Sequence, residues 1–273
     1  MISAQLVSDL ISLVKQAGRI ILQLYETQGT GLTTESQISP AVPVTAADVA
    51  AHRFIVGNLQ LLSPLLPVIS EEADIPVYEE RQKWPAFWIV DPLDGTKVFI
   101  SRNGEFTVNL ALVTGCRPVL GIIHSPILDL TYYALLGQGA FRQNGDRTPI
   151  RVSVTDRGNG GPRIVTSRSH PGERLEGFLS QVGSFELIKM GSSLKFCLVA
   201  DGSAHLYPRL GRTMEWDTAA GQCIVEAAGG QVTTVEGTPL LYNKKDLGNP
   251  DFIVSSGGPD WWGEYLRRPH FST

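Results

Sequence analysis

Two aspartates that follow an apolar run carry the strongest chemical signal in this sequence. Residues 87–90 have the composition of a buried strand, and the segment from Asp91 to Thr96 follows directly, with its second acid at Asp94. A buried strand holds the residues at its carboxyl end in a fixed place, which suits catalysis. Asp-Pro and Asp-Gly pairs also form turns, so the simpler alternative is a strand-to-loop junction whose acids only cap backbone groups.

A second acidic cluster, Glu71, Glu72 and Asp74, follows another apolar segment at residues 65–69. Taken alone, it is typical of a solvated acidic turn. If the two apolar segments are neighbouring strands, their acids converge at one sheet edge, where like charges repel unless a proton or a cation joins them. Oxygen ligands without histidine or thiolate suit hard cations, magnesium above all.

A third acid, Asp217, precedes a predicted helix at residues 218–228, which Gly229 and Gly230 end. The alternative is that Asp217 caps this helix, a common role for aspartate at that position. Capping and metal binding are compatible.

Composition indicates a folded enzyme-sized chain. The 273 residues are 42% hydrophobic and 18% charged, with a net charge of -4, which argues against a nucleic-acid polymer as the main partner and allows a small nucleotide. The cysteines Cys116, Cys197 and Cys223 lack metal-site spacing and are predicted to be reduced core thiols. Because no basic leader and no long apolar span is present, we expect a cytoplasmic protein.

Apolar periodicity predicts helices at residues 6–24 and 45–62, then neighbouring strands at 105–114, 119–124 and 131–136. The glycine-rich segment 158–162 is the strongest break and the predicted domain boundary, between residues 1–157 and 163–273. Beyond it, short strands alternate with helices. We expect strands at 163–166, 185–188 and 204–207 and near Gln231 and Phe252, and helices at 173–182, 194–201 and 218–228.

The three acidic segments together resemble those of the inositol monophosphatase superfamily. The matching segments are residues 70–72, 91–96 and 216–221, and further similarity at 43–48, 102–109, 191–200 and 206–209 points to its bacterial bisphosphate nucleotidase branch. The resemblance runs from the first helix to about Val254. It implies an α+β fold, the layered αβαβα sandwich of the sugar phosphatases, in which the first domain holds most metal ligands and the second supplies Asp217 and the nucleotide contacts.

The resemblance also implies a site for two or three Mg²⁺ ions. Its ligands would be Glu71, Asp91, the carbonyl of Leu93, Asp94 and Asp217, with Asp91 as the bridge between ions. Gly95 and Thr96 would present backbone N–H groups to the substrate phosphate. The implied catalytic residues that align or activate water are Asp48, Glu72 and Thr96, with Asp48 holding the Thr96 hydroxyl; the alternative for Asp48 is a charge at a helix start.

The nucleotidase branch implies substrate contacts from both halves of the chain. They include the metal-site residues Glu71, Leu93, Asp94 and Asp217, the phosphate-facing Gly95 and Thr96, and the nucleotide-facing Ser169, His170, Ser192, Ser193, Lys195 and Arg209. Arg168 and Arg212 are additional candidate cations. Each basic residue, taken singly, is as well explained by a solvated surface charge. The chain departs from the branch at Val98, where an acid is usual, and at Arg212, where a proline is usual.

The expected function is therefore Mg²⁺-dependent hydrolysis of the 3'-phosphate of adenosine 3',5'-bisphosphate to AMP and phosphate, linked to sulfur assimilation, with 3'-phosphoadenylyl sulfate as a second substrate. The nearest alternative is an inositol or general sugar phosphatase. An alternative of another class is a non-catalytic regulatory binding protein with this fold. Peripheral association with the inner membrane face and the oligomeric state stay open.

Overall fold

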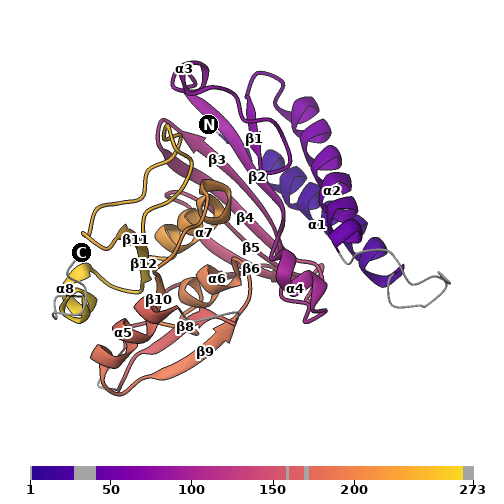
Figure 1. Cartoon of the computed structure of the whole chain (residues 1–273). Helices are drawn as coiled ribbons and strands as arrows, with labels where there is room; N and C mark the ends of the chain where they lie inside the picture. The colour runs from indigo at the N-terminus through magenta and orange to yellow at the C-terminus, as the bar shows by residue number, and fades with distance from the viewer. Residues whose placement is uncertain (1, 28–40, 158–159, 169–171, 267–273) are drawn as a thin grey trace.

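The computed structural model describes residues 2–27, 41–157, 160–168 and 172–266. Helices cover both faces of two separate sheets (Figure 1). The helices are α1 (Ala4–Thr27), α2 (Ala41–Leu62), α3 (Tyr78–Arg81), α4 (Thr96–Ile100), α5 (Glu173–Val182), α6 (Leu194–Ala200), α7 (Glu215–Ala227) and α8 (Pro259–Trp262), followed by a 3-10 turn, η1 (Gly263–Tyr265).

The first sheet has seven strands in chain order, as expected for a meander. Its first pair, β1 and β2, is parallel, and every later pair is antiparallel. The strands are β1 (Val68–Ser70), β2 (Ala86–Asp94), β3 (Thr107–Thr114), β4 (Arg117–Ser125), β5 (Leu130–Leu135), β6 (Gly139–Asn144) and β7 (Ile150–Val152).

The second sheet has the order β11-β12-β10-β8-β9. Strands β9, β8 and β10 are mutually parallel, whereas β12 is antiparallel to β10 and β11. The strands are β8 (Arg163–Ser167), β9 (Glu186–Met190), β10 (Leu206–Arg209), β11 (Gln231–Thr234) and β12 (Phe252–Ser255).

Strand β2 is buried on both faces and joins two of the cores. Trp88 and Val90 pack with α1 and α2, whereas Phe87 and Ile89 belong to the core that contains α6, α7 and one face of the second sheet. A third core lies beyond the second sheet, where Phe178 of α5 and Trp262 of α8 pack together. The layers therefore run α1/α2, first sheet, α6/α7, second sheet, α5/α8 (Figure 1), which confirms the predicted αβαβα sandwich.

Three local predictions were wrong. Asp91 and Asp94 lie in the irregular end of β2 rather than on a free turn, because β3 pairs with both of them on either side of a register shift. Helix α7 begins at Glu215, so Asp217 lies inside its first turn and Met214 is the N-cap. Cys116 is exposed, since it lies at the reversal between β3 and β4.

The sheets fall on either side of residues 158–162, where the sequence breaks. Helix α7, from the later half of the chain, nevertheless packs on β4 of the first sheet. The division into two domains stays a prediction.

Candidate active site

The parallel pairing of β1 with β2 brings the first two acidic segments together. Ser70 pairs with Val90, and the Glu71 N–H donates to the Val90 carbonyl at 3.3 Å. Glu71 and Asp91 are therefore adjacent at the carboxyl edge of the sheet. Helix α7 brings Asp217 to the same edge, and one carboxylate oxygen from each of the three acids lies within 4.8 Å of the other two.

Asp91 lies at the centre of this group and is 1% exposed. Its Oδ1 accepts the Leu93 N–H at 3.1 Å, whereas its Oδ2 is buried and has no partner among the described residues. A buried carboxylate oxygen without a donor is costly, so this atom is suited to an additional positive ligand.

The electrostatics of the cluster are those of crowded anions. Burial, followed by the charges of Asp94, Glu71 and Asp217, raises the pKa of Asp91 well above its usual range. Burial and then Asp94 raise the pKa of Asp217 to about 7, against the opposing hydrogen bond from the Met214 N–H. Burial also raises the pKa of Glu71. These carboxyl groups resist ionisation until a cation joins them.

Asp94 is held by the segment that precedes α6. Its Oδ2 accepts the Ser193 N–H at 2.6 Å and the Ser193 hydroxyl at 2.8 Å. The same hydroxyl also contacts the Asp217 carbonyl and receives a hydrogen bond from Asn109, so Ser193 ties β2, β3 and α7 together.

Gly95 is required by both its backbone and its surroundings. Its φ of 99° is in the left-handed region, and a Cβ there would lie 2.1 Å from the Ser192 hydroxyl oxygen. That hydroxyl donates to the Asp94 carbonyl at 2.8 Å. The chain can therefore pass close to Ser192, and α4 begins at the exposed Thr96.

Asp48 of α2 is buried beside this edge. Burial, with the neighbouring Glu72 and Glu71 carboxyls, raises the pKa of Asp48 to about 8. Its Oδ1 is unpaired, and no hydrogen bond to Thr96 occurs among the described residues. The pairing of Asp48 with Thr96 stays a prediction.

Two cations face the acids across a cavity of about 310 Å³. Lys195 is 6% exposed, lies 5.3 Å from the Tyr207 ring centroid and donates to the Ser192 carbonyl; burial lowers its pKa to about 8. Arg209 donates to the Ser167 hydroxyl at 3.3 Å, and its buried Nε has no partner among the described residues. The cavity is lined by Asp94, Gly95, Thr96, Ser192, Ser193, Lys195, Arg209 and Asp217, among others.

The remaining predicted contacts are less closely assembled. Arg168 lines the cavity but is ion-paired with Glu105, whereas Arg212 pairs with Asp246 at 3.6 Å outside it. Val98 also lines the cavity. Ser169 and His170 lie outside the described residues.

Sequence reasoning missed two residues here. Glu105 accepts the Gly191 N–H at 2.7 Å and holds Arg168, and the Tyr207 ring lies beside Lys195. Both residues lie in segments that resemble the family, at 102–109 and 206–209. These motifs indicated that the segments matter but did not predict the contacts of the two side chains.

Comparison with known proteins identifies the family. The inositol monophosphatase family matches residues 4–265. The chain belongs to that family. A 3'(2'),5'-bisphosphate nucleotidase CysQ from Salmonella typhimurium is 45% identical over 92% of this chain and 99% of its own, and the Escherichia coli K12 protein of the same name is 44% identical over the same shares.

Solved structures of family members agree. A CysQ from Bacteroides thetaiotaomicron superposes with a TM-score of 0.82 at 40% identity, covering 92% of this chain and 97% of its own. An inositol monophosphatase II from Staphylococcus aureus gives 0.79 at 25% identity, with 99% and 96% covered. The predictions of family, fold and an enzyme that hydrolyses phosphoric monoesters are confirmed.

The acids present fit the metal dependence of this family. Three converging carboxylates with raised pKa values and an unpaired Asp91 oxygen form an oxygen-only site, as a hard cation requires. Of the described helices, none is both long and apolar enough to cross a bilayer.

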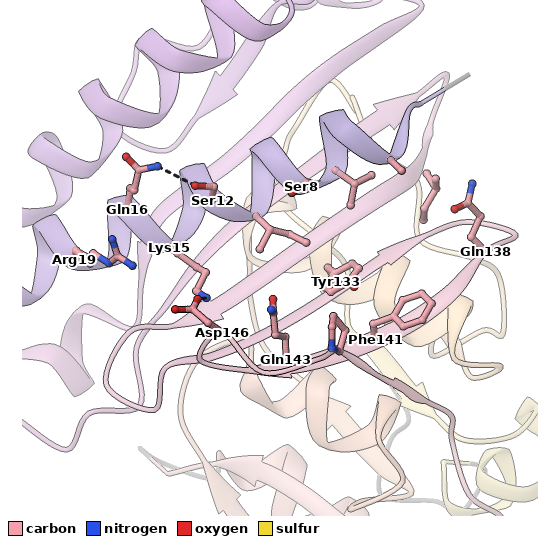
Figure 2. Close-up of a pocket in the computed structure, with 15 residues that line it drawn as sticks. Ser8, Ser12, Lys15, Gln16, Arg19, Tyr133, Gln138, Phe141, Gln143 and Asp146 are labelled. Carbon is pink, nitrogen blue, oxygen red and sulfur yellow. Dashed lines mark hydrogen bonds and ion pairs between the residues drawn. The ribbon is translucent and has the colours of Figure 1, made fainter.

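A larger cavity, of about 520 Å³, lies between α1 and strands β5 and β6 (Figure 2). Its one lining carboxylate, Asp146, is paired with Lys15 at 2.8 Å. This larger cavity therefore lacks the two carboxylates, Asp94 and Asp217, that line the smaller one.

Proposed function

We propose that this chain is a Mg²⁺-dependent 3'(2'),5'-bisphosphate nucleotidase that converts adenosine 3',5'-bisphosphate to AMP and phosphate. One observation carries the proposal: a single cavity is lined by Asp94 and Asp217 of the acid group and by the two cations Lys195 and Arg209. The names of the Salmonella and Escherichia relatives support the same substrate class.

We assign the metal ligands to Glu71, Asp91, the Leu93 carbonyl, Asp94 and Asp217, for two or three Mg²⁺ ions. Bound magnesium would lower the pKa of the attacking water and neutralise charge on the phosphoryl and leaving oxygens. The raised pKa values of Asp91 and Asp217 support this assignment, because burial and, after it, repulsion between the carboxylates disfavour their charged forms until a cation binds.

The chain's own residues align the reacting groups. Gly95 lets the backbone approach the phosphate, and its N–H and that of Thr96 would donate to phosphoryl oxygens. The Thr96 hydroxyl, Asp48 and Glu72 would orient the water. In the reaction, the water oxygen bonds to phosphorus, the bond from phosphorus to the ribose 3'-oxygen breaks, and that oxygen takes a proton to give AMP.

The second, uncleaved phosphate is assigned to Lys195 and Arg209, together with Ser192 and Ser193. Arg209 offers an unpaired buried Nε donor, and an arginine fork matches phosphate oxygens. We assign Ser169 and His170 to the adenine side. The same contacts suit 3'-phosphoadenylyl sulfate, and both substrates would link the protein to sulfur assimilation.

Phosphate release from adenosine 3',5'-bisphosphate and from inositol 1-phosphate, at equal concentration with Mg²⁺, tests the proposal. We expect a clear preference for the bisphosphate, because inositol phosphate has no second phosphate for Lys195 and Arg209. Preference for inositol 1-phosphate would refute the substrate assignment in favour of a sugar phosphatase.

A further inference from the structure

A buried polar network joins the two chain segments that carry Glu71 and Asp217. Its members are Arg81 on α3, Glu215 at the start of α7, and Asn243 and Lys244 in the loop that follows β11; we call these four residues the clamp. Arg81 is 2% exposed and Glu215 is fully buried.

Arg81 donates hydrogen bonds to the loop from one side. Its Nη1 donates to Asn243 Oδ1 at 2.6 Å, and its Nη2 donates to the Lys244 carbonyl at 3.2 Å. In return, the Asn243 side-chain amide donates to the Arg81 carbonyl at 2.7 Å. Arg81 also donates to the carbonyl of Pro76, within the segment that leads from Glu71 to α3.

Glu215 accepts hydrogen bonds from the same loop on its other side. Its Oε2 accepts the Asn243 N–H at 2.6 Å, and its Oε1 accepts the Lys244 N–H at 3.0 Å and the Lys244 ammonium at 2.6 Å. Asn243 adopts a φ of 64°, a conformation that lets both its backbone and its side chain face these partners.

Such a network is expensive to bury unless its groups are satisfied, and here the charged groups are. It also spans the metal site: Glu71 precedes α3 on one side of the loop, and Asp217 follows Glu215 by two residues on the other. Asn249 further secures the start of α7 by donating to the Met214 carbonyl at 2.8 Å.

We propose that the clamp positions Asp217 relative to Glu71 and thereby sets metal affinity, an inference that rests on the proposed function. The four residues are positioning residues: they act through the backbone of two ligand-bearing segments. Groups that hydrogen-bond a metal ligand directly change metal affinity 10- to 100-fold, so we expect the lower end of that range for a clamp that acts through the backbone.

Asn243→Gly tests the clamp with little backbone strain, because glycine tolerates the positive φ while both side-chain hydrogen bonds to Arg81 are lost. Arg81→Met tests the same side of the clamp, because it removes the guanidinium that donates to Asn243 Oδ1 and to the carbonyls of Lys244 and Pro76. Arg163→Met is the matched control, since Arg163 also donates to two loop carbonyls, those of Gly202 and Ser203, but lies at the start of β8 and does not line the cavity.

The measurement is the Mg²⁺ concentration that gives half of the maximal rise in melting temperature, without substrate. We expect an increase of about 10-fold in Asn243→Gly and Arg81→Met and no change in Arg163→Met. In turnover assays, saturating metal should restore kcat, and KM for the nucleotide should stay constant.

The inference would be overturned if both clamp variants kept the wild-type metal affinity and only had a lower melting temperature, as Arg163→Met does. The clamp would then contribute to stability alone. If Arg81→Met fails to fold, Asn243→Gly decides the question. Failure of the proposed function is a distinct result. A wrong substrate would show in the comparison of esters and leave the Mg²⁺ titration of the wild type unchanged, whereas a wrong metal assignment would leave the wild type without a saturable rise in melting temperature.

Discussion

At the scale of single residues, the site consists of buried charged groups that lower the stability of the fold until an ion of opposite charge binds. Glu71, Asp91 and Asp217 converge within 4.8 Å, and burial and mutual repulsion favour their neutral forms. Across the cavity, burial disfavours the charged form of Lys195. The acid cluster therefore favours binding of a cation, and the Lys195 side of the cavity favours binding of an anion.

Asp217→Asn should stabilise the metal-free protein, and more so at high pH. The pKa of Asp217 is about 7 in the fold and near 3.8 when unfolded, so its stabilising contribution is present below pH 4 and is lost as pH rises through 7. Asparagine does not titrate. Melting temperatures in chelator should differ little from wild type at pH 4 and most at pH 8.

The exposed Asp246 provides the control for that experiment, because Asp246→Asn removes a charge outside the cluster. The sign should reverse with Mg²⁺, which should stabilise wild type more than Asp217→Asn. A variant that is destabilised equally at both pH values in chelator would contradict the account in which burial and repulsion raise the pKa of Asp217.

Lys195→Ala should raise KM for the bisphosphate with little change in kcat, whereas Asp94→Asn should abolish turnover of every ester.

The wild-type KM for the bisphosphate should also rise about 10-fold between pH 7 and 9, because the pKa of Lys195 is about 8 and the charged form binds the anion. Lys195→Arg keeps its charge and should remove this dependence. Equal losses with inositol 1-phosphate would exclude Lys195 as a selector.

At the scale of elements, the site depends on how closely α7 lies on the first sheet. A Cβ at Gly121 of β4 would be 2.4 Å from the Ala220 carbonyl oxygen, and one at Gly221 would meet the Phe196 ring at 2.4 Å. These two glycines let α7 and α6 pack tightly against their neighbours, and Asp217 is carried on the first turn of α7.

Gly121→Ala should therefore destabilise the protein by about 1–3 kcal/mol through overpacking against a backbone atom, and should weaken Mg²⁺ binding by displacing α7. Gly57→Ala is the matched control. Nothing lies within 4 Å of a Cβ at Gly57, and alanine favours helix α2 by about 0.5–1 kcal/mol. Chemical unfolding and metal titration measure both effects. Unchanged metal affinity in a destabilised Gly121→Ala would separate α7 packing from the site.

At the scale of the whole molecule, the residues of the proposed active site come from several layers. Asp48 comes from α2 on one side of the first sheet, Asp91 from that sheet, Asp217 from the helix layer between the sheets, and Arg209 from the second sheet. Because the metal would bind only the assembled layers, it should stabilise the folded chain as a unit.

Mg²⁺ at 100 times its dissociation constant should stabilise the fold by about 2.7 kcal/mol, and chelation should reverse this. Differential scanning calorimetry at pH 7.5 with and without Mg²⁺ measures the shift. Sodium chloride of equal ionic strength controls for general salt effects. Stabilisation by chelator would contradict a metal site at the acid cluster.

The sequence by itself determined the local chemistry. The segments containing Glu71, Asp91, Asp94 and Asp217 are contiguous motifs, and strand and helix periodicity followed from residues that lie next to one another in the chain. Helix α5 has the predicted bounds, and the expected meander of neighbouring strands is present as β3, β4 and β5. Predicted ends failed where a distant strand intervened, as at Asp91 and Asp94, whose pairing with β3 lengthened β2.

The tertiary structure alone decided which groups face one another. Several contacts join residues that are far apart in sequence. Ser192, with its left-handed backbone, lies beside Gly95, and Ser193 donates a hydrogen bond to Asp94. Packing also buries Lys195, and the clamp connects Arg81 to Glu215 through the loop. Distances and desolvation set the pKa values and the metal geometry, and both arise only when the sheets and α7 pack together. Residue types fixed the reaction class, whereas packing set the spacing of its charges.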